Sequence, residues 1–168
     1  LKDSLIDTPY LGVLVDQCKT IDQAKAVLSF LDAVSEKQQK GVVSLTAARG
    51  RGKSASIGLC LAGAIAYGYG LIYITAPSPE NLQTAFEFIL KGLVALKYKE
   101  HLDYSVSYTT GESGKIMVGI AMHGDHRQFI RYAPPHDSTL LSSSELIAID
   151  EAAAIPLPTV KSLLGSKL

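Results

Sequence analysis

Two well-separated segments carry residues whose types and spacing suit the chemistry of a nucleoside triphosphate. Residues 46–54 read Thr-Ala-Ala-Arg-Gly-Arg-Gly-Lys-Ser and follow a short apolar run. Residues 146–154 read Leu-Ile-Ala-Ile-Asp-Glu-Ala-Ala-Ala, so that an apolar run ends in two carboxylates. A glycine-rich turn with a lysine can hold phosphates, and carboxylates can hold a metal ion and activate water. The two segments together, but neither alone, predict a nucleotide triphosphate site.

The first segment has what a polyphosphate needs at the start of a helix. Glycine permits a tight loop with inward-pointing N–H groups, and the following helix adds the positive end of its dipole. We predict that Lys53 reaches the β and γ phosphates and that the Ser54 hydroxyl binds Mg²⁺. Backbone donors are expected from the neighbouring positions Gly50, Arg51, Gly52 and Ala55.

One position departs from the general phosphate-loop pattern, because Ala47 stands where glycine is usual. The alternative is an ordinary helix N-terminus that contains Gly-Lys-Ser by chance. We favour the phosphate loop because a predicted strand, turn and helix fall where the motif requires them. Arg49 and Arg51 are either solvated or in contact with phosphate or a partner, and the sequence does not decide between these.

The second segment places two carboxylates at the end of a predicted buried strand. Open α/β sheets bind ligands beyond the carboxyl ends of their strands. Successive strand residues point in opposite directions, so two adjacent carboxylates can have different tasks. We predict that Asp150 holds Mg²⁺ and that Glu151 polarises the attacking water. Taken alone, the segment is more typical of a strand entering a solvated loop, and the phosphate loop shifts the preference.

Strand and helix patterns alternate along the chain and predict an α/β fold with a mainly parallel sheet. The predicted strands are 11–15, 41–46, 71–76, 105–108, 116–120, 128–132 and 146–150. The predicted helices are 21–34, capped by Thr20, 53–67, one beginning at Ser78 and a short one from Pro158. Residues 36–40 are expected to form a polar turn. Residues 1–40 would supply a lead-in strand and helix, and residues 41–168 the core.

Composition indicates a globular domain with a hydrophobic core. The 168 residues are 47% hydrophobic and 19% charged, which argues against disorder. Lys plus Arg and Asp plus Glu both number 16, which argues against a strongly basic nucleic-acid module but leaves room for a local basic groove. Cys18 and Cys60 are too few for a disulfide framework. We find no signal peptide or membrane-spanning run, and the missing initiator methionine suggests a fragment.

Residues 126–132, His-Arg-Gln-Phe-Ile-Arg-Tyr, mix basic and aromatic side chains as nucleic-acid surfaces do. A strand with one wet face explains the same pattern, and we keep both interpretations. The run from His123 to His126 could bind a metal through its histidines, but no cysteine or third ligand is spaced to help, so a surface loop is the better interpretation.

Several longer strings resemble the eukaryotic RNA cytidine acetyltransferase family, nucleolar enzymes related to TmcA. The resemblance covers nearly the whole chain, and Ala47 is the family's own form of the phosphate loop. Residues 105–140 match loosely, and the family continues after Gly165 into a further strand and a glycine-containing motif. The matching strings are residues 12–16, 18–20, 22–28, 45–55, 77–82, 100–104, 149–158 and 160–165.

The resemblance implies a RecA-like, P-loop helicase module that is incomplete at its C-terminus. Such a module would bind and hydrolyse ATP with Mg²⁺ in support of cytidine N4 acetylation in small-subunit rRNA and certain tRNAs. Acetyl-CoA would be used by a domain outside this chain. The expected location is the nucleolus within the nucleus, and the expected partners are RNA and pre-ribosomal small-subunit factors. No membrane is expected, and a homodimer is left open.

A rival interpretation from another class is a structural module. In it, nucleotide binding would switch folding or docking inside a pre-ribosomal particle without turnover. A third interpretation, a small-molecule kinase with a phosphate loop, lacks any substrate-pocket signature. The sequence does not say where the arginine that completes the ATP site would come from.

Overall fold

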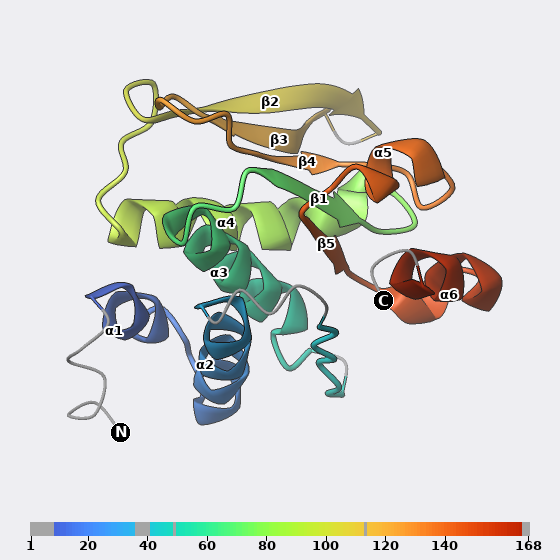
Figure 1. Ribbon diagram of the computed structural model, residues 1–168, viewed down its shortest axis with the longest axis horizontal. Helices are drawn as coiled ribbons and strands as arrows, with labels where there is room; N and C mark the ends of the chain where they lie inside the picture. Colours follow the sequence, from blue (N-terminus) through green and yellow to red (C-terminus); the bar gives the residue numbers. More distant parts are fainter. Residues whose placement is uncertain (1–8, 36–40, 49, 113, 166–168) are drawn as a thin grey trace.

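The computed structural model describes residues 9–35, 41–48, 50–112 and 114–165. These residues form a five-stranded sheet with the strand order β2-β3-β4-β1-β5, with α3 and α4 lying along one face (Figure 1). The strands are β1 (Leu71–Thr75), β2 (Tyr104–Gly111), β3 (Gly114–Met122), β4 (Phe129–Tyr132) and β5 (Leu146–Ile149).

Six α-helices and two short 3₁₀ turns complete the described part of the chain. The α-helices are α1 (Pro9–Val15), α2 (Ile21–Ser35), α3 (Lys53–Ala66), α4 (Gln83–Ala95), α5 (Ser138–Ser142) and α6 (Leu157–Gly165). The 3₁₀ turns are η1 (Pro79–Leu82) and η2 (Ala152–Ala154). Over the described ranges, no helix has the length and apolar character needed to cross a bilayer. The fold is α/β, as the strand–helix alternation predicts.

The sheet is mixed, with a parallel and an antiparallel part. Strand β1 lies between β4 and β5 and pairs with both in parallel. Strand β3 pairs antiparallel with β2 and with β4. The predicted hairpin and the predicted strand at 128–132 are therefore confirmed. The carboxyl ends of β1, β4 and β5 meet at one edge of the sheet, which is where an α/β sheet can build a site.

The main core lies between the sheet and the two helices α3 and α4. Helix α3 is buried on nearly all sides, because ten of its residues from Ala55 to Ile65 are buried. Two glycines allow the helices to approach closely. A Cβ atom at Gly58 would overlap the Ala85 carbonyl and come within 2.7 Å of the Phe88 Cβ, and one at Gly92 would overlap the Ala62 Cβ. The position of α3 is therefore tightly fixed.

A smaller apolar cluster lies on the opposite face of the sheet. It contains Tyr73 and Phe129 from the strands, Ala133, Leu141 of α5 and Leu163 of α6. Strand alternation explains the division, because Ile72 and Ile74 of β1 belong to the main core while Tyr73 points the other way. The outer face is thus partly covered by α5 and α6.

The predicted strand at 11–15 is wrong, because these residues lie in helix α1. A short apolar run does not distinguish strand from helix by periodicity alone. The helical form places Leu11 and Leu14 one turn apart, and both contact the main core, with Leu14 fully buried. Tertiary packing therefore decides the conformation.

The predicted strand at 41–46 is also not formed. Residues 41–48 have no regular secondary structure, and Val42 and Val43 are 50% and 48% exposed. A β-branched run favours an extended chain, but a strand also needs a neighbour to bond with. Both edges of β1 are taken by β4 and β5, and residues 41–48 pair neither with the open edge of β5 nor with any other described strand. The predicted turn at 36–40, Arg49 and residues 166–168 lie outside the described residues.

Two glycine-to-alanine substitutions should have opposite effects on stability. Gly58→Ala is expected to lower the free energy of unfolding by about 1–3 kcal/mol, because the added methyl overlaps α4. Gly12→Ala in α1 should raise the free energy of unfolding by about 0.5–1 kcal/mol. A Cβ atom added at Gly12 would have no neighbouring side chain or element within 4 Å, and alanine favours a helix. Equilibrium urea unfolding measures both. Equal effects at the two sites would contradict the close α3–α4 contact.

Candidate functional site

The turn before α3 depends on glycine. Gly50 and Gly52 have φ angles of 79° and 76°, in the left-handed region that side chains with a Cβ atom disfavour. Gly52 is the N-cap residue of α3, and the helix starts at Lys53 with no side-chain cap among the described residues. The first N–H groups of a helix have no partner within it. The backbone donors of this N-terminus are of the kind that an anion can accept from, which is consistent with the predicted phosphate loop.

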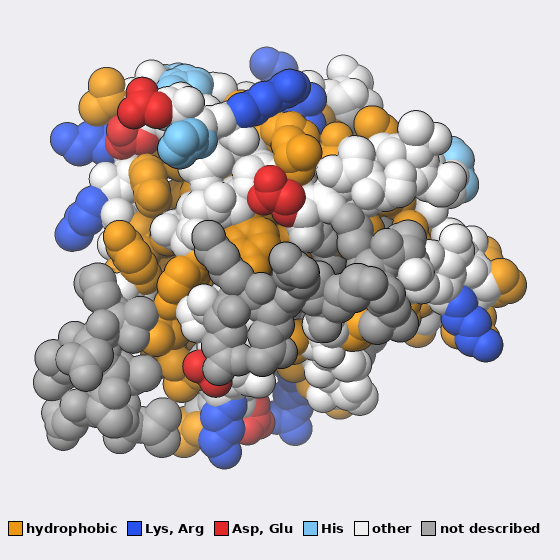
Figure 2. Space-filling view, viewed as in Figure 1, with side chains coloured by type: hydrophobic (Ala, Val, Ile, Leu, Met, Phe, Trp, Pro, Cys, Tyr) orange, Lys and Arg blue, Asp and Glu red, His pale blue; other side chains and the backbone are white. Residues whose placement is uncertain are grey.

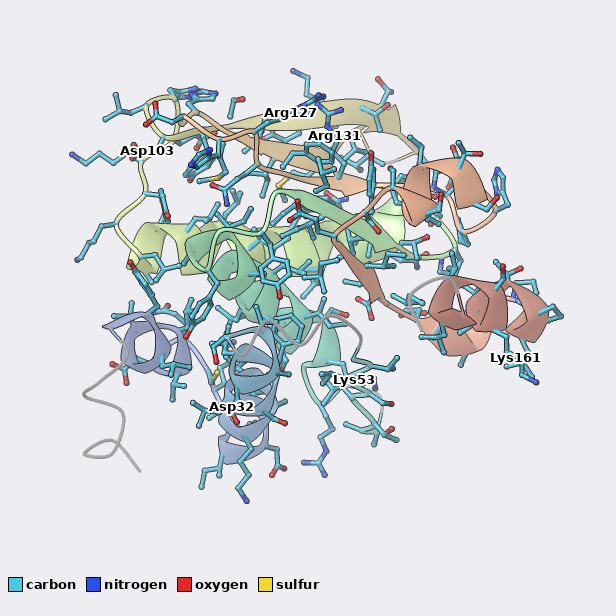
Figure 3. All side chains as sticks on the ribbon, in the orientation of Figure 1. Asp32, Lys53, Asp103, Arg127, Arg131 and Lys161 are labelled. Atoms are coloured by element: carbon cyan, nitrogen blue, oxygen red, sulfur yellow. The ribbon has the colours of Figure 1, made fainter. Side chains whose placement is uncertain are left out.

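The Lys53 side chain folds back over its own loop (Figure 3). Its ammonium donates hydrogen bonds to the carbonyl oxygens of Ala47 at 2.6 Å and Ala48 at 3.0 Å. The loop thus curls around a positive charge at the positive end of a helix. Ser54 follows in the first turn and is half-buried. The lysine ammonium beside the loop and the serine hydroxyl in the first turn are both groups that suit a polyphosphate and its cation.

Gln23 of α2 supports the loop, and this role was not predicted from the sequence. Its Oε1 accepts from the N–H groups of Lys19 at 2.8 Å and Thr20 at 3.3 Å, which completes the predicted capping box. Its Nε2 donates to the Gly52 carbonyl at 3.3 Å. A Cβ atom at Gly52 would collide with Gln23. A glutamine three residues after a helix N-cap is typical of a capping box, and this pattern carries no signal of a contact with a loop 29 positions away.

Asp150 lies at the carboxyl end of β5 and is only 4% exposed. Its backbone N–H donates to the Thr75 carbonyl at 2.9 Å, and its Oδ1 accepts from the Glu151 N–H at 2.9 Å. Its Oδ2 is buried and has no hydrogen-bond partner in the described part of the chain. An unpartnered buried carboxylate oxygen is costly and suits a hard cation such as Mg²⁺. The residue therefore fits the predicted metal ligand.

Glu151 has a very different environment from its neighbour. It is exposed, and its φ angle is 51°, which is uncommon for a residue with a side chain. The hydrogen bond from its N–H to Asp150 holds this sharp turn at the end of the strand. One carboxylate is thus buried at the strand end while the next reaches solvent, so the two are suited to different tasks.

The topology brings the loop before α3 and the carboxylates after β5 to the same edge of the sheet. The end of α3 lies beside the start of β4, because Gln128 Nε2 donates to the Ile65 carbonyl at 3.0 Å and the Tyr69 carbonyl at 2.9 Å. The N-terminus of α3 therefore points toward the opposite edge, where Asp150 follows β5. No hydrogen bond or ion pair within the described ranges joins Lys53 or Ser54 to either carboxylate.

The α/β sheet, the glycine turn at the start of α3 and the buried carboxylate after β5 define a RecA-like, helicase-type domain. The model of the family described as RNA cytidine acetyltransferase NAT10/TcmA, helicase domain, matches residues 44–167. The chain therefore belongs to the RNA cytidine acetyltransferase family, as the sequence strings predict.

Proteins named RNA cytidine acetyltransferase are similar to this chain over its whole length. Those of Homo sapiens and Mus musculus are each 56% identical over 169 residues, and that of Saccharomyces cerevisiae is 53% identical. The match covers 100% of this chain but only 16% of each of these relatives. The chain thus spans only a small part of the length of these relatives, each of which is named as an enzyme.

Replacing Asp150 by asparagine should stabilise the chain when no divalent cation is present. The substitution removes a buried negative charge but keeps the oxygen that accepts from Glu151. We expect the free energy of unfolding to rise by about 1 kcal/mol in EDTA. Chemical unfolding monitored by circular dichroism measures this.

Asp137→Asn is the matched control for this prediction. Asp137 caps α5 by accepting from the Leu140 N–H at 3.1 Å, and asparagine caps a helix equally well. Its effect should stay within about 0.5 kcal/mol. A loss of stability in Asp150→Asn would show that the buried carboxylate has a structural partner and would contradict the metal assignment.

Proposed function

We propose that this chain is the ATP-binding and ATP-hydrolysing helicase-like module of an RNA N4-cytidine acetyltransferase. The observation that carries the proposal is the buried, unpartnered Oδ2 of Asp150 at the sheet edge toward which the N-terminus of α3 points. An anion-binding helix end and a cation-binding carboxylate at one edge match the two charges of Mg²⁺–ATP. The family membership supports the same conclusion.

The loop before α3 would bind the phosphates. Lys53 would exchange the Ala47 and Ala48 carbonyls for the β and γ phosphate oxygens, which are stronger acceptors because they are charged. Backbone N–H groups would come from Gly50, Arg51, Gly52 and Ala55. Gln23 would hold the loop in place through the Gly52 carbonyl.

The cation and the attacking water would be handled by three side chains. Ser54 and Asp150 would hold Mg²⁺, which when bound neutralises charge on the phosphate oxygens. Glu151 would orient a water molecule and accept its proton. The exposed Glu151 side chain is free to do so, because its backbone alone is fixed by Asp150.

The acetyl transfer would occur outside this chain, in a domain that uses acetyl-CoA. Hydrolysis here would support acetylation of cytidine N4 in small-subunit rRNA and tRNA. The same protein would serve small-subunit ribosome biogenesis with pre-ribosomal factors in the nucleolus, with a homodimer as one arrangement. An arginine from elsewhere would complete the ATP site. These points rest on the resemblance.

A second candidate function is a nucleotide-dependent docking module without turnover. The observation that favours it is the lack of any hydrogen bond or ion pair between Lys53 or Ser54 and Glu151 in the described structure. Such a module would bind ATP and change its docking in a pre-ribosomal particle. Phosphate release from the full-length protein distinguishes the two functions, because only the first requires it.

Lys53→Ala should abolish ATP binding or turnover in the full-length protein. The substitution removes the ammonium that would neutralise the phosphates, so we expect turnover to fall by at least about 100-fold. Steady-state phosphate release and nucleotide-binding titration measure this. Lys161→Ala, which removes an exposed lysine from α6, serves as the control. Undiminished turnover in Lys53→Ala would contradict the site.

Glu151→Gln should separate binding from hydrolysis. Glutamine keeps the size of the side chain but accepts protons poorly, so ATP should still bind with similar affinity while turnover falls about 100-fold. Single-turnover hydrolysis with pre-bound ATP measures the chemical step directly. A variant that hydrolyses ATP at the rate of the unmodified protein would remove Glu151 from the water-activating role.

A further inference from the structure

The antiparallel part of the sheet has two chemically different faces. Toward α3 and α4 it presents Val106, Ile120 and Ile130. These residues are cross-strand neighbours on β2, β3 and β4, and they pack in the main core. The outer face carries two further sets of cross-strand neighbours. One set is Ser105, Ala121 and Phe129, and the other is Ser107, Gly119 and Arg131. Apart from Phe129 and Arg131, these outer side chains are small or hydroxyl-bearing. The outer face is therefore flat and polar at its surface.

Two arginines flank the one large apolar side chain of this face. The guanidinium carbon of Arg131 lies 4.7 Å from the centre of the Phe129 ring, and that of Arg127 lies 5.7 Å from it. The edge of Phe129 also meets the Tyr73 ring, with centroids 5.4 Å apart, so Phe129 is only 5% exposed. Stacking holds the guanidinium planes while leaving their N–H groups available.

Neither guanidinium is neutralised within the described part of the chain. No carboxylate there lies within salt-bridge distance of Arg127 or Arg131, and no hydrogen bond to either side chain is present. Both arginines are exposed. They lie together over β3 and β4, far from Lys53 and Lys161 in the same view (Figure 3), and Lys and Arg side chains gather there in the space-filling view (Figure 2). A local positive potential thus sits on a chain with no net charge.

A shallow hollow of about 500 Å³ adjoins Arg131. Its lining combines the exposed hydroxyl-bearing residues Ser107 and Thr109 of β2 with the apolar side chains of Pro79, Val118 and Tyr132. Another hydroxyl group lies nearer the start of β2, where the Oγ of Ser105 is 3.1 Å from His123 Nε2. Arginines and hydroxyls are the side chains that most often contact phosphate oxygens. The hollow therefore offers donors to phosphodiesters.

We propose that this outer face of β2, β3 and β4 binds the sugar–phosphate backbone of single-stranded RNA. The inference takes from the proposed function only that the full-length protein acts on RNA, and it does not depend on ATP hydrolysis. The charge and hydroxyls of the face match a polyanion. The face does not favour an apolar protein partner, because such a partner would remove the two exposed guanidiniums from water, and Phe129 is already covered.

Binding at this face is expected to be independent of base sequence. The Phe129 ring is flanked by the two guanidiniums and Tyr73, so Phe129 itself offers no free surface on which a base could stack. The contacts that remain are to phosphate and sugar, which position a strand without reading it. The face would therefore hold RNA passing over the module rather than select the cytidine.

The test is RNA binding by the full-length protein over a series of salt concentrations. Fluorescence anisotropy with a labelled, mixed-sequence single-stranded RNA oligonucleotide gives the affinity. The double variant Arg127→Gln, Arg131→Gln should bind roughly tenfold more weakly at low salt. The slope of log affinity against log salt should become shallower by about 1.4, since each lost phosphate contact on a single strand removes about 0.7.

Two control variants distinguish a charge contact from a folding effect. Arg127→Lys, Arg131→Lys keeps the charge and should keep most of the salt slope. Lys161→Gln removes one exposed charge from α6 and should leave both affinity and slope unchanged. RNA-free ATP turnover and the thermal midpoint of each variant report on the nucleotide site and on folding. Preserved turnover with weakened RNA binding is the expected pattern.

The proposal is overturned if the double glutamine variant binds RNA with unchanged affinity and slope. It is also overturned if Lys161→Gln weakens binding as much as the double glutamine variant does, because the effect would then be one of general charge. Protection of both arginines from a guanidine-modifying reagent in RNA-free full-length protein would show that polypeptide covers the face. None of these outcomes depends on ATP turnover, which Lys53→Ala tests separately.

Discussion

The close contact between α3 and α4 is the constraint on which the candidate site depends. Gly58 and Gly92 let the helix backbones approach to a distance that a Cβ atom would prevent. Helix α3 is then enclosed by apolar side chains and cannot shift along its axis without opening the core. Because Lys53 is its first residue, fixing the helix also fixes the base of the loop. Gln23 adds a polar contact from α2 at the same point.

Several residues of the candidate site depart from the usual rules of backbone conformation, helix capping and hydrogen-bond satisfaction. Glu151 has a positive φ angle, Asp150 buries a carboxylate oxygen without a partner, and α3 begins without a side-chain cap. Each feature has a cost in free energy. They stand at the N-terminus of α3 and after β5, the two segments in which the sequence carries glycines, a lysine and carboxylates. A site that binds charged ligands would recover these costs on binding.

The sequence predicted the parts of the fold that depend on local pattern. Helices α2 and α3 and strands β1 and β5 follow from periodicity, caps and turn residues, and the loop residues from glycine spacing. What it could not predict depends on contacts distant in the chain. Residues 11–15 are helical because Leu14 packs into the core in that form. Residues 41–46 pair with no described strand. The contact between Gln23 and Gly52 spans 29 positions and leaves no local trace.

Strand β1 connects the candidate nucleotide site to the outer basic face through two neighbouring carbonyls. The Thr75 carbonyl accepts from the Asp150 N–H at 2.9 Å, and the Ile74 carbonyl accepts from the Ala133 N–H at 3.1 Å, just after β4. Along β4, Ile130 packs in the core while Arg131 points outward. A shift of one residue in the pairing register of β4 would exchange the faces on which these two side chains lie. The packing that places Asp150 thus also places Arg131.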